Sequence, residues 1–299
     1  MQTILIAGGT GLIGDRLSAL LQQKGYTVRL LSRKPKGAGQ YAWDPAKGTL
    51  DVAALEGVEA VINLAGAGIA DGRWTAARKQ LIIDSRVESA RVLRTAFQKN
   101  NIFPKTYLSA SAIGYYGNSG EQWMGETTAP VDDSFMVECC GAWENAAEEI
   151  GALGIRTVIL RIGVVLAKDG GALPEFVKPL RFGLGAYFGN GQAWYSWVHL
   201  DDICQMFIWA LENEQVAGVF NAVAPHPVRN IDLVKATAKA MRQPALFAPA
   251  PPFVLRLMLG EMSAVVLNSN RVSSEKIRAA GFHFAFPQVE GALAAALSA

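Results

Sequence analysis

Closely spaced glycines follow the first apolar stretch of the chain and could bring its backbone against a phosphate group. Residues 8–14 read GGTGLIG, with glycines spaced three apart at positions 8, 11 and 14. A glycine permits a sharp turn, and a glycine without a Cβ lets a pyrophosphate approach the backbone. A helix beginning here would offer free N–H groups and a favourable dipole to an anion. The predicted contacts, with a plain turn as the alternative, are Gly8, Thr10, Gly11, Leu12, Ile13 and Gly14.

The residues after the next predicted strand indicate which dinucleotide the turn would take. An Asp or Glu about 20 residues past the glycines usually binds the ribose 2′-hydroxyl of NAD. This chain has no acidic residue between Asp15 and Asp44, and it carries Ser32 and Arg33 at the end of that strand. A guanidinium makes a bidentate, charge-assisted contact with a phosphate, and a serine hydroxyl adds a donor. These residues favour NADP(H); the alternative is a solvated basic turn.

Such residues need a scaffold in which strands end side by side. Apolar runs predict the strands Thr3–Ala7, Tyr26–Leu31, Ala60–Leu64, Thr106–Ser109, Arg156–Leu160 and Gly218–Ala222. Apolar spacing and stop signals predict the helices Leu12–Gln23, Thr75–Lys99, Ser134–Leu153 and Asp201–Glu212. Because strand and helix alternate, we expect parallel pairing through right-handed crossovers. The predicted fold class is α/β, a doubly wound, Rossmann-like parallel sheet with a small, mostly helical C-terminal region on the substrate side.

The second half of the chain differs in composition from the first. Glycines and aromatic residues become frequent after about residue 162, and we expect the segment at about 163–199 to form substrate-side loops. The prolines between Pro244 and Pro252 indicate a linker-like stretch, followed by helix. We therefore predict a dinucleotide-binding domain at 1–247, which includes those loops, and a small C-terminal domain at 248–299.

Composition excludes several classes of partner. The net charge is +2 and the basic residues are scattered, so we expect no nucleic-acid partner. No apolar run approaches the roughly 18 residues that span a bilayer, and the N-terminus lacks the pattern of a signal peptide, so we expect no membrane partner. The three cysteines have no metal-ligand or disulfide spacing, and no metal site is predicted. A reducing, cytoplasmic location and a small-molecule substrate are the resulting expectations.

Several segments of the chain resemble one protein family. Residues 8–14, Asn63–Gly66 and Trp197–Ile203 are similar to motifs of the extended short-chain dehydrogenase/reductases, the NAD(P)-dependent epimerase/dehydratase group. The segments 31–35, 84–86 and 161–166 resemble more narrowly its atypical branch, the YfcH-like epimerase family proteins. Those proteins end in a domain of unknown function, which residues 248–297 resemble. The resemblance therefore covers essentially the whole chain.

The resemblance implies contacts with a dinucleotide beyond the glycine turn. Ser32 and Arg33 would hold the adenosine 2′-phosphate, and Arg86 would reach the phosphates. A solvent-facing position on its helix is the alternative for Arg86. The resemblance also implies that Asn63, Leu64, Ala65 and Gly66 lie beside the cofactor and that Val165 lies near the nicotinamide.

The catalytic pair of that family is missing here. The family uses Tyr and Lys four residues apart, because they share a helix face and the ammonium lowers the pKa of the phenol. None of the seven tyrosines has a lysine four residues later, and alignment on Glu144 places the pair at Met136 and Cys140. The remaining catalytic candidates are Ser111, whose hydroxyl would bind a substrate carbonyl, and Tyr115, or its neighbour Tyr116, which would supply a proton. Packing roles are the alternative for both.

Two classes of function are therefore compatible with the sequence. One is an NADP(H)-dependent oxidoreductase or epimerase of a small molecule, because the cofactor carries the hydride chemistry and the protein mainly positions it. The other is a catalytically inactive NADP(H)-binding sensor or scaffold, which the missing Tyr–Lys pair favours. The fold hosts both classes.

Overall fold

The chain folds into two compact units, each assembled from separate segments. The computed structural model describes residues 2–298. The first unit comprises the residues up to 111 together with 138–160 and 204–219, and the second comprises 112–137, 161–203 and the residues from 220 onward. Between residues 2 and 298 no helix combines the length and the apolar character that crossing a bilayer requires.

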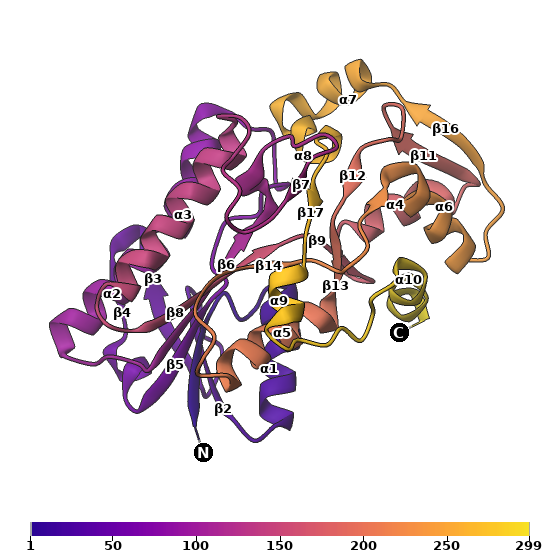
Figure 1. The fold of residues 1–299 in the computed structure, drawn as a ribbon. Helices are drawn as coiled ribbons and strands as arrows, with labels where there is room; N and C mark the ends of the chain where they lie inside the picture. Colours follow the sequence, from indigo (N-terminus) through magenta and orange to yellow (C-terminus); the bar gives the residue numbers. More distant parts are fainter. Residues whose placement is uncertain (1, 299) are drawn as a thin grey trace. The chain divides into compact units, whose positions relative to one another are not determined.

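A mostly parallel eight-stranded sheet forms the centre of the first unit, with the strand order β14-β8-β6-β5-β1-β2-β3-β4 (Figure 1). The strands are β1 Thr3–Ala7, β2 Thr27–Ser32, β3 Gln40–Asp44, β4 Thr49–Leu50, β5 Val58–Asn63, β6 Thr106–Ala112, β8 Arg156–Ile162 and β14 Gly218–Ala222. β1 pairs in parallel with β2 and β5, β5 with β6 and β2 with β3, whereas β4 runs antiparallel to β3. β8 and β14 continue along the chain into the second unit.

Helices cover both faces of this sheet. They are α1 Leu12–Gln23, α2 Ala76–Asn100, α3 Phe135–Gly151 and α5 Leu200–Glu212. Figure 1 shows α2 and α3 on one face and α1 and α5 on the other. Successive side chains of β1 point to opposite faces of the sheet. On one face, Leu5 packs with Phe97 of α2 and Ile150 of α3 in one buried cluster. The sequence prediction of a doubly wound α/β sheet is confirmed.

The predicted elements agree with the observed ones except at their ends and at the edge of the sheet. β6 extends to Ala112 rather than Ser109, so Ser111 lies within a strand. β3 and β4 were not predicted. β3 buries Trp43 alone among its five residues, and it therefore lacks the apolar run that marks the central strands.

Small sheets and short helices make up the second unit. Its paired strands are β9 Val164–Ala167 with β10 Gly170–Gly171 and β13 Trp197–His199, β12 Trp194–Tyr195 with β15 Val228–Arg229, and β7 Trp123–Met124 with β17 Arg271–Val272. The helices are α4 Leu173–Leu180, α6 Asn230–Ala240, α7 Pro252–Leu259, α8 Ala264–Leu267, α9 Glu275–Ala279 and α10 Val289–Ser298. Leu173 of α4, Leu233 of α6 and Leu293 of α10 share one buried cluster with Trp197. These contacts explain how short elements form a stable unit.

The stretch interpreted as a linker contains a strand, so that prediction is wrong. β16, Leu246–Ala250, pairs in parallel with β11, Leu184–Phe188, in a two-stranded sheet. Proline is tolerated at a sheet edge because its missing N–H then costs no ladder hydrogen bond, and Pro249 lies on such an edge strand. The predicted boundary after residue 247 falls inside β16 and stays a prediction.

Candidate functional site

The glycine turn between β1 and α1 has a geometry that side chains would obstruct. Gly8 has a positive φ of 79°, and a Cβ on it would lie 2.8 Å from the backbone carbonyl of Leu64. A Cβ on Gly14 would lie 2.4 Å from the carbonyl oxygen of Gly8. Gly11 is different, because a Cβ there would meet that same oxygen at 3.4 Å and no other neighbour. Gly11 also begins α1 without a side chain to cap it, which leaves the first N–H groups for an anion.

Parallel pairing brings the ends of four strands to this turn. Ala7 of β1 is in register with Leu31 of β2 and with Asn63 of β5, and Asn63 is in register with Ser109 of β6. The predicted cofactor residues that follow these strands therefore share the carboxyl edge of one sheet. Ligands of open α/β sheets bind at this edge.

Ser32 and Arg33 stand at the end of β2, next to the glycine turn. The hydroxyl of Ser32 accepts a hydrogen bond of 3.2 Å from the backbone N–H of Lys34, which orders the turn. Arg33 is exposed, and its side chain forms no hydrogen bond or ion pair with any part of the chain between residues 2 and 298. Its guanidinium is therefore free to pair with an anion beside the glycines.

Asn63 shapes the loop after β5 with its side chain. Its amide nitrogen donates to Ser89 of α2 at 2.9 Å and to the hydroxyl of Tyr107 at 2.8 Å, and its oxygen accepts from the N–H of Ala65 at 3.1 Å. The residue is fully buried. Leu64, Ala65 and the exposed Gly66 follow in that loop, so its backbone presents them at the sheet edge.

Arg86 fixes the same loop from α2. Its Nη1 donates to the carbonyls of Ala67 at 3.1 Å and Ile82 at 2.9 Å, and its Cζ lies 4.8 Å from the ring centroid of Trp143. Burial lowers the pKa of the guanidinium, while the Cys139 and Cys140 thiols act in the opposite direction. The side chain is 9% exposed, so the alternative of a solvent-facing residue does not hold. Arg86 places a buried cation directly beside Gly66.

Ser111 donates its hydroxyl proton to a carboxylate. Its Oγ lies 2.6 Å from Oε1 of Glu144 on α3, and both side chains are buried. A hydroxyl has one proton, so Ser111 in this arrangement can accept a hydrogen bond from a substrate hydroxyl but cannot also donate to a carbonyl.

Tyr115 lies in the second unit, in the short 3₁₀ helix Ile113–Tyr116 that follows β6. The guanidinium of Arg161 stacks on its ring, with Cζ 3.4 Å from the centroid, and also donates to the hydroxyl of Tyr116 at 2.9 Å. Val165 belongs to the second unit as well, where it is paired with Val198 in the β9–β13 ladder. The structure thus gathers the other dinucleotide candidates on the first unit and places Val165, together with Tyr115, on the second.

Comparison with known proteins shows which family the chain resembles. The profile of the NAD dependent epimerase/dehydratase family matches residues 4–222, and a domain of unknown function, DUF1731, matches residues 250–296. The epimerase family protein YfhF of Bacillus subtilis (strain 168) is 37% identical over 97% of this chain and 96% of its own length. The chain belongs to the NAD dependent epimerase/dehydratase family. The resemblance noted in the sequence is confirmed.

Solved structures support the same assignment. The human epimerase family protein SDR39U1 (isoform 2), whose crystal structure is with NADPH, is 31% identical, with 99% of each chain covered and a TM-score of 0.89. The UDP-glucose 4-epimerase of Thermus thermophilus, in complex with NAD, is 19% identical over 99% of this chain and 98% of its own, with a TM-score of 0.78. The second likeness shows the shared fold alone.

In the family pattern, the Tyr–Lys pair would stand in α3. Met136 lies in the first turn of α3, and Cys140, one turn further on, is 1% exposed. Arg86 of α2 interacts electrostatically with the thiol of Cys140. Burial raises the pKa of the neighbouring Cys139 thiol, which keeps it in its neutral form.

Sequence reasoning missed two features of this site. The Ser111–Glu144 hydrogen bond joins residues far apart in the chain, and the one available signal was an isolated Glu in the apolar face of a predicted helix. The hydrogen bonds that hold the loop after β5 were also missed. There Ser85 accepts from the N–H of Ala67, and Trp74 donates to the carbonyl of Ile69.

Proposed function

We propose that this member of the epimerase/dehydratase family binds NADP(H) and acts as an oxidoreductase or epimerase of a small molecule. The observation that carries the proposal is the glycine turn beside Arg33, an exposed arginine at the end of β2 that pairs with no residue of the described part of the chain, 2–298. A dinucleotide with a 2′-phosphate matches both features, because its pyrophosphate suits the turn and its extra phosphate suits the guanidinium.

The residues present fit such a cofactor. Gly11 leaves space where a Cβ would stand, and the helix it begins has no side-chain cap. No acidic residue accompanies Ser32 and Arg33 to repel a phosphate. The human relative SDR39U1, with 31% identity, has a structure with NADPH, which supports the same cofactor here.

The bound dinucleotide would supply hydride transfer. The residues of this chain would orient the reactants. The backbone of Leu64 and Ala65 would line the cofactor at the end of β5, where Asn63 holds the turn. Ser111, whose hydroxyl donates a hydrogen bond to Glu144, would accept one from a hydroxyl of the substrate. Tyr115, supported by the guanidinium of Arg161, is the candidate proton donor.

Arg33→Ala tests the cofactor assignment. We expect NADPH binding to weaken by about 1.5–3 kcal/mol, the contribution of a hydrogen bond to a charged group, and NADH binding to change little. Fluorescence titration of both cofactors measures this. Arg91→Ala, which removes another exposed arginine of the first unit, serves as the matched control. Equal losses for NADPH and NADH would contradict the assignment of Arg33 to the 2′-phosphate.

The second candidate function is an inactive NADP(H)-binding sensor or scaffold. Met136 and Cys140 favour it, because neither side chain can replace the Tyr–Lys pair of the family. Screening NADPH oxidation against panels of carbonyl compounds and sugar nucleotides separates the two functions. Turnover that disappears in Tyr115→Phe supports the enzyme, whereas tight NADPH binding without turnover on a broad panel supports the sensor.

A further inference from the structure

Large apolar side chains are exposed where the two-stranded β11–β16 sheet of the second unit begins. Phe182, just before β11, is 90% exposed, Leu246 at the start of β16 is 81% exposed, and Leu184 is 43% exposed. Leu184 and Leu246 are in register, so their side chains project from the same face of the sheet. We call Phe182, Leu184 and Leu246 the apolar cluster. Single exposed apolar residues are common, whereas a group of them marks an interaction site.

Three cations stand in the segments that carry this cluster. Arg181 directly precedes it, and Arg242 follows α6, where its N–H donates to the carbonyl of Lys239 at 3.0 Å. All three side chains are exposed, and none forms a hydrogen bond or an ion pair within residues 2–298. The carbonyl oxygen of Pro244 would lie 3.7 Å from a Cβ on Gly183. Arg181 and Arg242 therefore belong to two segments that are in contact.

Acidic residues are missing from these segments. None occurs in residues 176–200 or 233–260, although the whole chain has 26 acidic against 28 basic residues. Glu175, just outside the first segment, is paired with Lys178 on α4. Asp232 stands in the first turn of α6, whereas the cations follow from the last turn. The surroundings of the apolar cluster are therefore positive in a nearly neutral protein.

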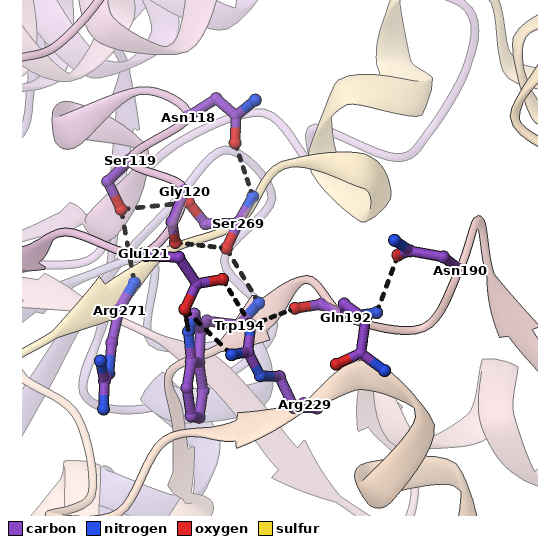
Figure 2. A network of polar contacts seen from close by, with 10 residues as sticks. All are labelled: Asn118, Ser119, Gly120, Glu121, Asn190, Gln192, Trp194, Arg229, Ser269 and Arg271. Atoms are coloured by element: carbon purple, nitrogen blue, oxygen red, sulfur yellow. Dashed lines mark hydrogen bonds and ion pairs between the residues drawn. The ribbon is translucent and has the colours of Figure 1, made fainter.

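Polar contacts fix the support of the cluster at its other end. Asn230, at the start of α6, accepts from the N–H of Phe188, at the end of β11, at 2.6 Å. Arg229 donates to the carboxylate of Glu121 and to the carbonyl of Gln192 (Figure 2). This arginine is thus paired within the chain, unlike the two beside the apolar cluster. Because these bonds join β11 to α6, the cluster projects from an ordered support.

The combination of exposed apolar groups and free cations matches the surface of a bilayer that contains anionic lipids. Apolar side chains enter the boundary between headgroups and acyl chains, and Lys and Arg are attracted to the anionic headgroups. A second copy of the chain does not match, because a two-fold axis would bring like charges together. Single-stranded nucleic acid does not match, because its bases stack on aromatic rings and two members of the cluster are leucines.

We propose that this face of the second unit docks on a lipid surface with anionic headgroups. Phe182 and Leu246 enter the apolar layer, and Arg181, Lys239 and Arg242 contact the headgroup phosphates. The expectation of no membrane partner rested on the lack of a spanning run, and docking on a surface needs none. The proposal does not depend on the dinucleotide, and its test is made without one.

Sedimentation of the full chain with lipid vesicles tests the proposal. The vesicles are phosphatidylcholine alone and an equal mixture of phosphatidylcholine and phosphatidylserine. We expect the chain to bind the mixed vesicles more tightly than the neutral ones, and the preference to fall as salt is raised, because salt screens the charges. Phe182→Ser should weaken binding to the mixed vesicles by about tenfold or more, since one buried phenylalanine is lost.

Matched variants separate the apolar contribution from the charged one. Phe103→Ser removes a phenylalanine that is 47% exposed on the first unit, and it should leave binding unchanged. The double variant Arg181→Gln/Arg242→Gln should abolish the preference for the mixed vesicles. Lys99→Gln/Arg278→Gln removes two exposed cations elsewhere and should retain that preference.

The same experiments define what would overturn the proposal. Failure of the wild-type chain to bind the mixed vesicles would do so, as would equal effects of Phe182→Ser and Phe103→Ser. A lipid-free dimer in gel filtration that Phe182→Ser dissociates would also overturn it, because a second copy would then cover the cluster. Thermal unfolding confirms that each variant is folded, and Leu246→Ser replaces Phe182→Ser if the latter is not.

Discussion

At the scale of single residues, the atoms that a Cβ would meet explain which positions of the glycine turn require glycine for packing. Gly14 is pressed against the turn itself: its Cβ would lie 2.4 Å from the carbonyl oxygen of Gly8 and 2.6 Å from the Cα of Gly9. Both neighbours are backbone, which cannot rotate away as a side chain can. Gly11 has no such restriction, so packing does not account for its glycine, whereas approach of the proposed dinucleotide would.

Gly14→Ala should therefore destabilise the protein, since overpacking of rigid backbone costs about 1–3 kcal/mol. Gly141→Ala is the matched control, because it also replaces a helical glycine but its Cβ would meet no atom within 4 Å. That control should gain up to about 1 kcal/mol from helix propensity. Urea unfolding measures both. Equal stability of the two variants would show that the turn adapts to a methyl group.

At the scale of elements, one buried asparagine connects two strands and a helix. Asn63 ends β5, and its amide reaches Ser89 on α2 and Tyr107 on β6 while its oxygen orders the following turn. Burial raises the pKa of Tyr107 to about 12, so its phenol stays neutral and can accept the amide proton. The loop that presents Leu64 and Ala65 is thereby tied to the sheet rather than left to fluctuate.

Asn63→Leu should destabilise the fold by at least about 2 kcal/mol, because buried partners lose their hydrogen bonds without replacement. Chemical denaturation provides the measurement. Asn100→Leu removes an asparagine at the C-terminus of α2, where its amide donates to one backbone carbonyl, and should change stability much less. A small effect at position 63 would mean that water can replace the amide.

The elements also show where sequence patterns stop being informative. Central strands such as β1 and β5 are buried on both sides, and their apolar runs predicted them. β3 lies next to the last strand of its sheet and buries one residue, and β16 lies at a sheet edge and contains a proline, so no apolar run marks either strand.

At the scale of the whole molecule, the C-terminal DUF1731 segment is held to the epimerase fold of the second unit by a buried carboxylate. Asp202, near the start of α5, accepts from the backbone N–H groups of Ala285 at 2.8 Å and Phe286 at 3.0 Å. The ring of Phe286 also packs on His199, with 4.0 Å between centroids. Burial raises the pKa of Asp202 above its ordinary value of 3.8, even though the two N–H groups act to lower it.

This raised pKa fixes the sign of a pH effect. The folded state holds the Asp202 proton more tightly than the unfolded state, so the contribution of Asp202 is most favourable at acid pH. It declines as the pH rises from about 3.8 through the raised folded value. Wild type should therefore lose stability relative to Asp202→Asn between pH 4 and pH 7, as urea unfolding would show. Asp232→Asn, at an exposed position, should show no such trend. If wild type instead gained stability relative to Asp202→Asn as the pH rises, the raised pKa of Asp202 would be contradicted.

The sequence by itself determined the doubly wound sheet, the family and the glycine turn, because these depend on local spacing and on apolar runs that burial requires. It also indicated a 2′-phosphate partner through Arg33, whose side chain forms no hydrogen bond or ion pair within residues 2–298. Tertiary structure alone decided which polar groups meet. The Ser111–Glu144 bond, the bond from Arg86 to the Ala67 carbonyl and the packing of Arg271 on Trp123 each join residues from separate segments. Their energies depend on burial and distance, which spacing along a chain does not encode.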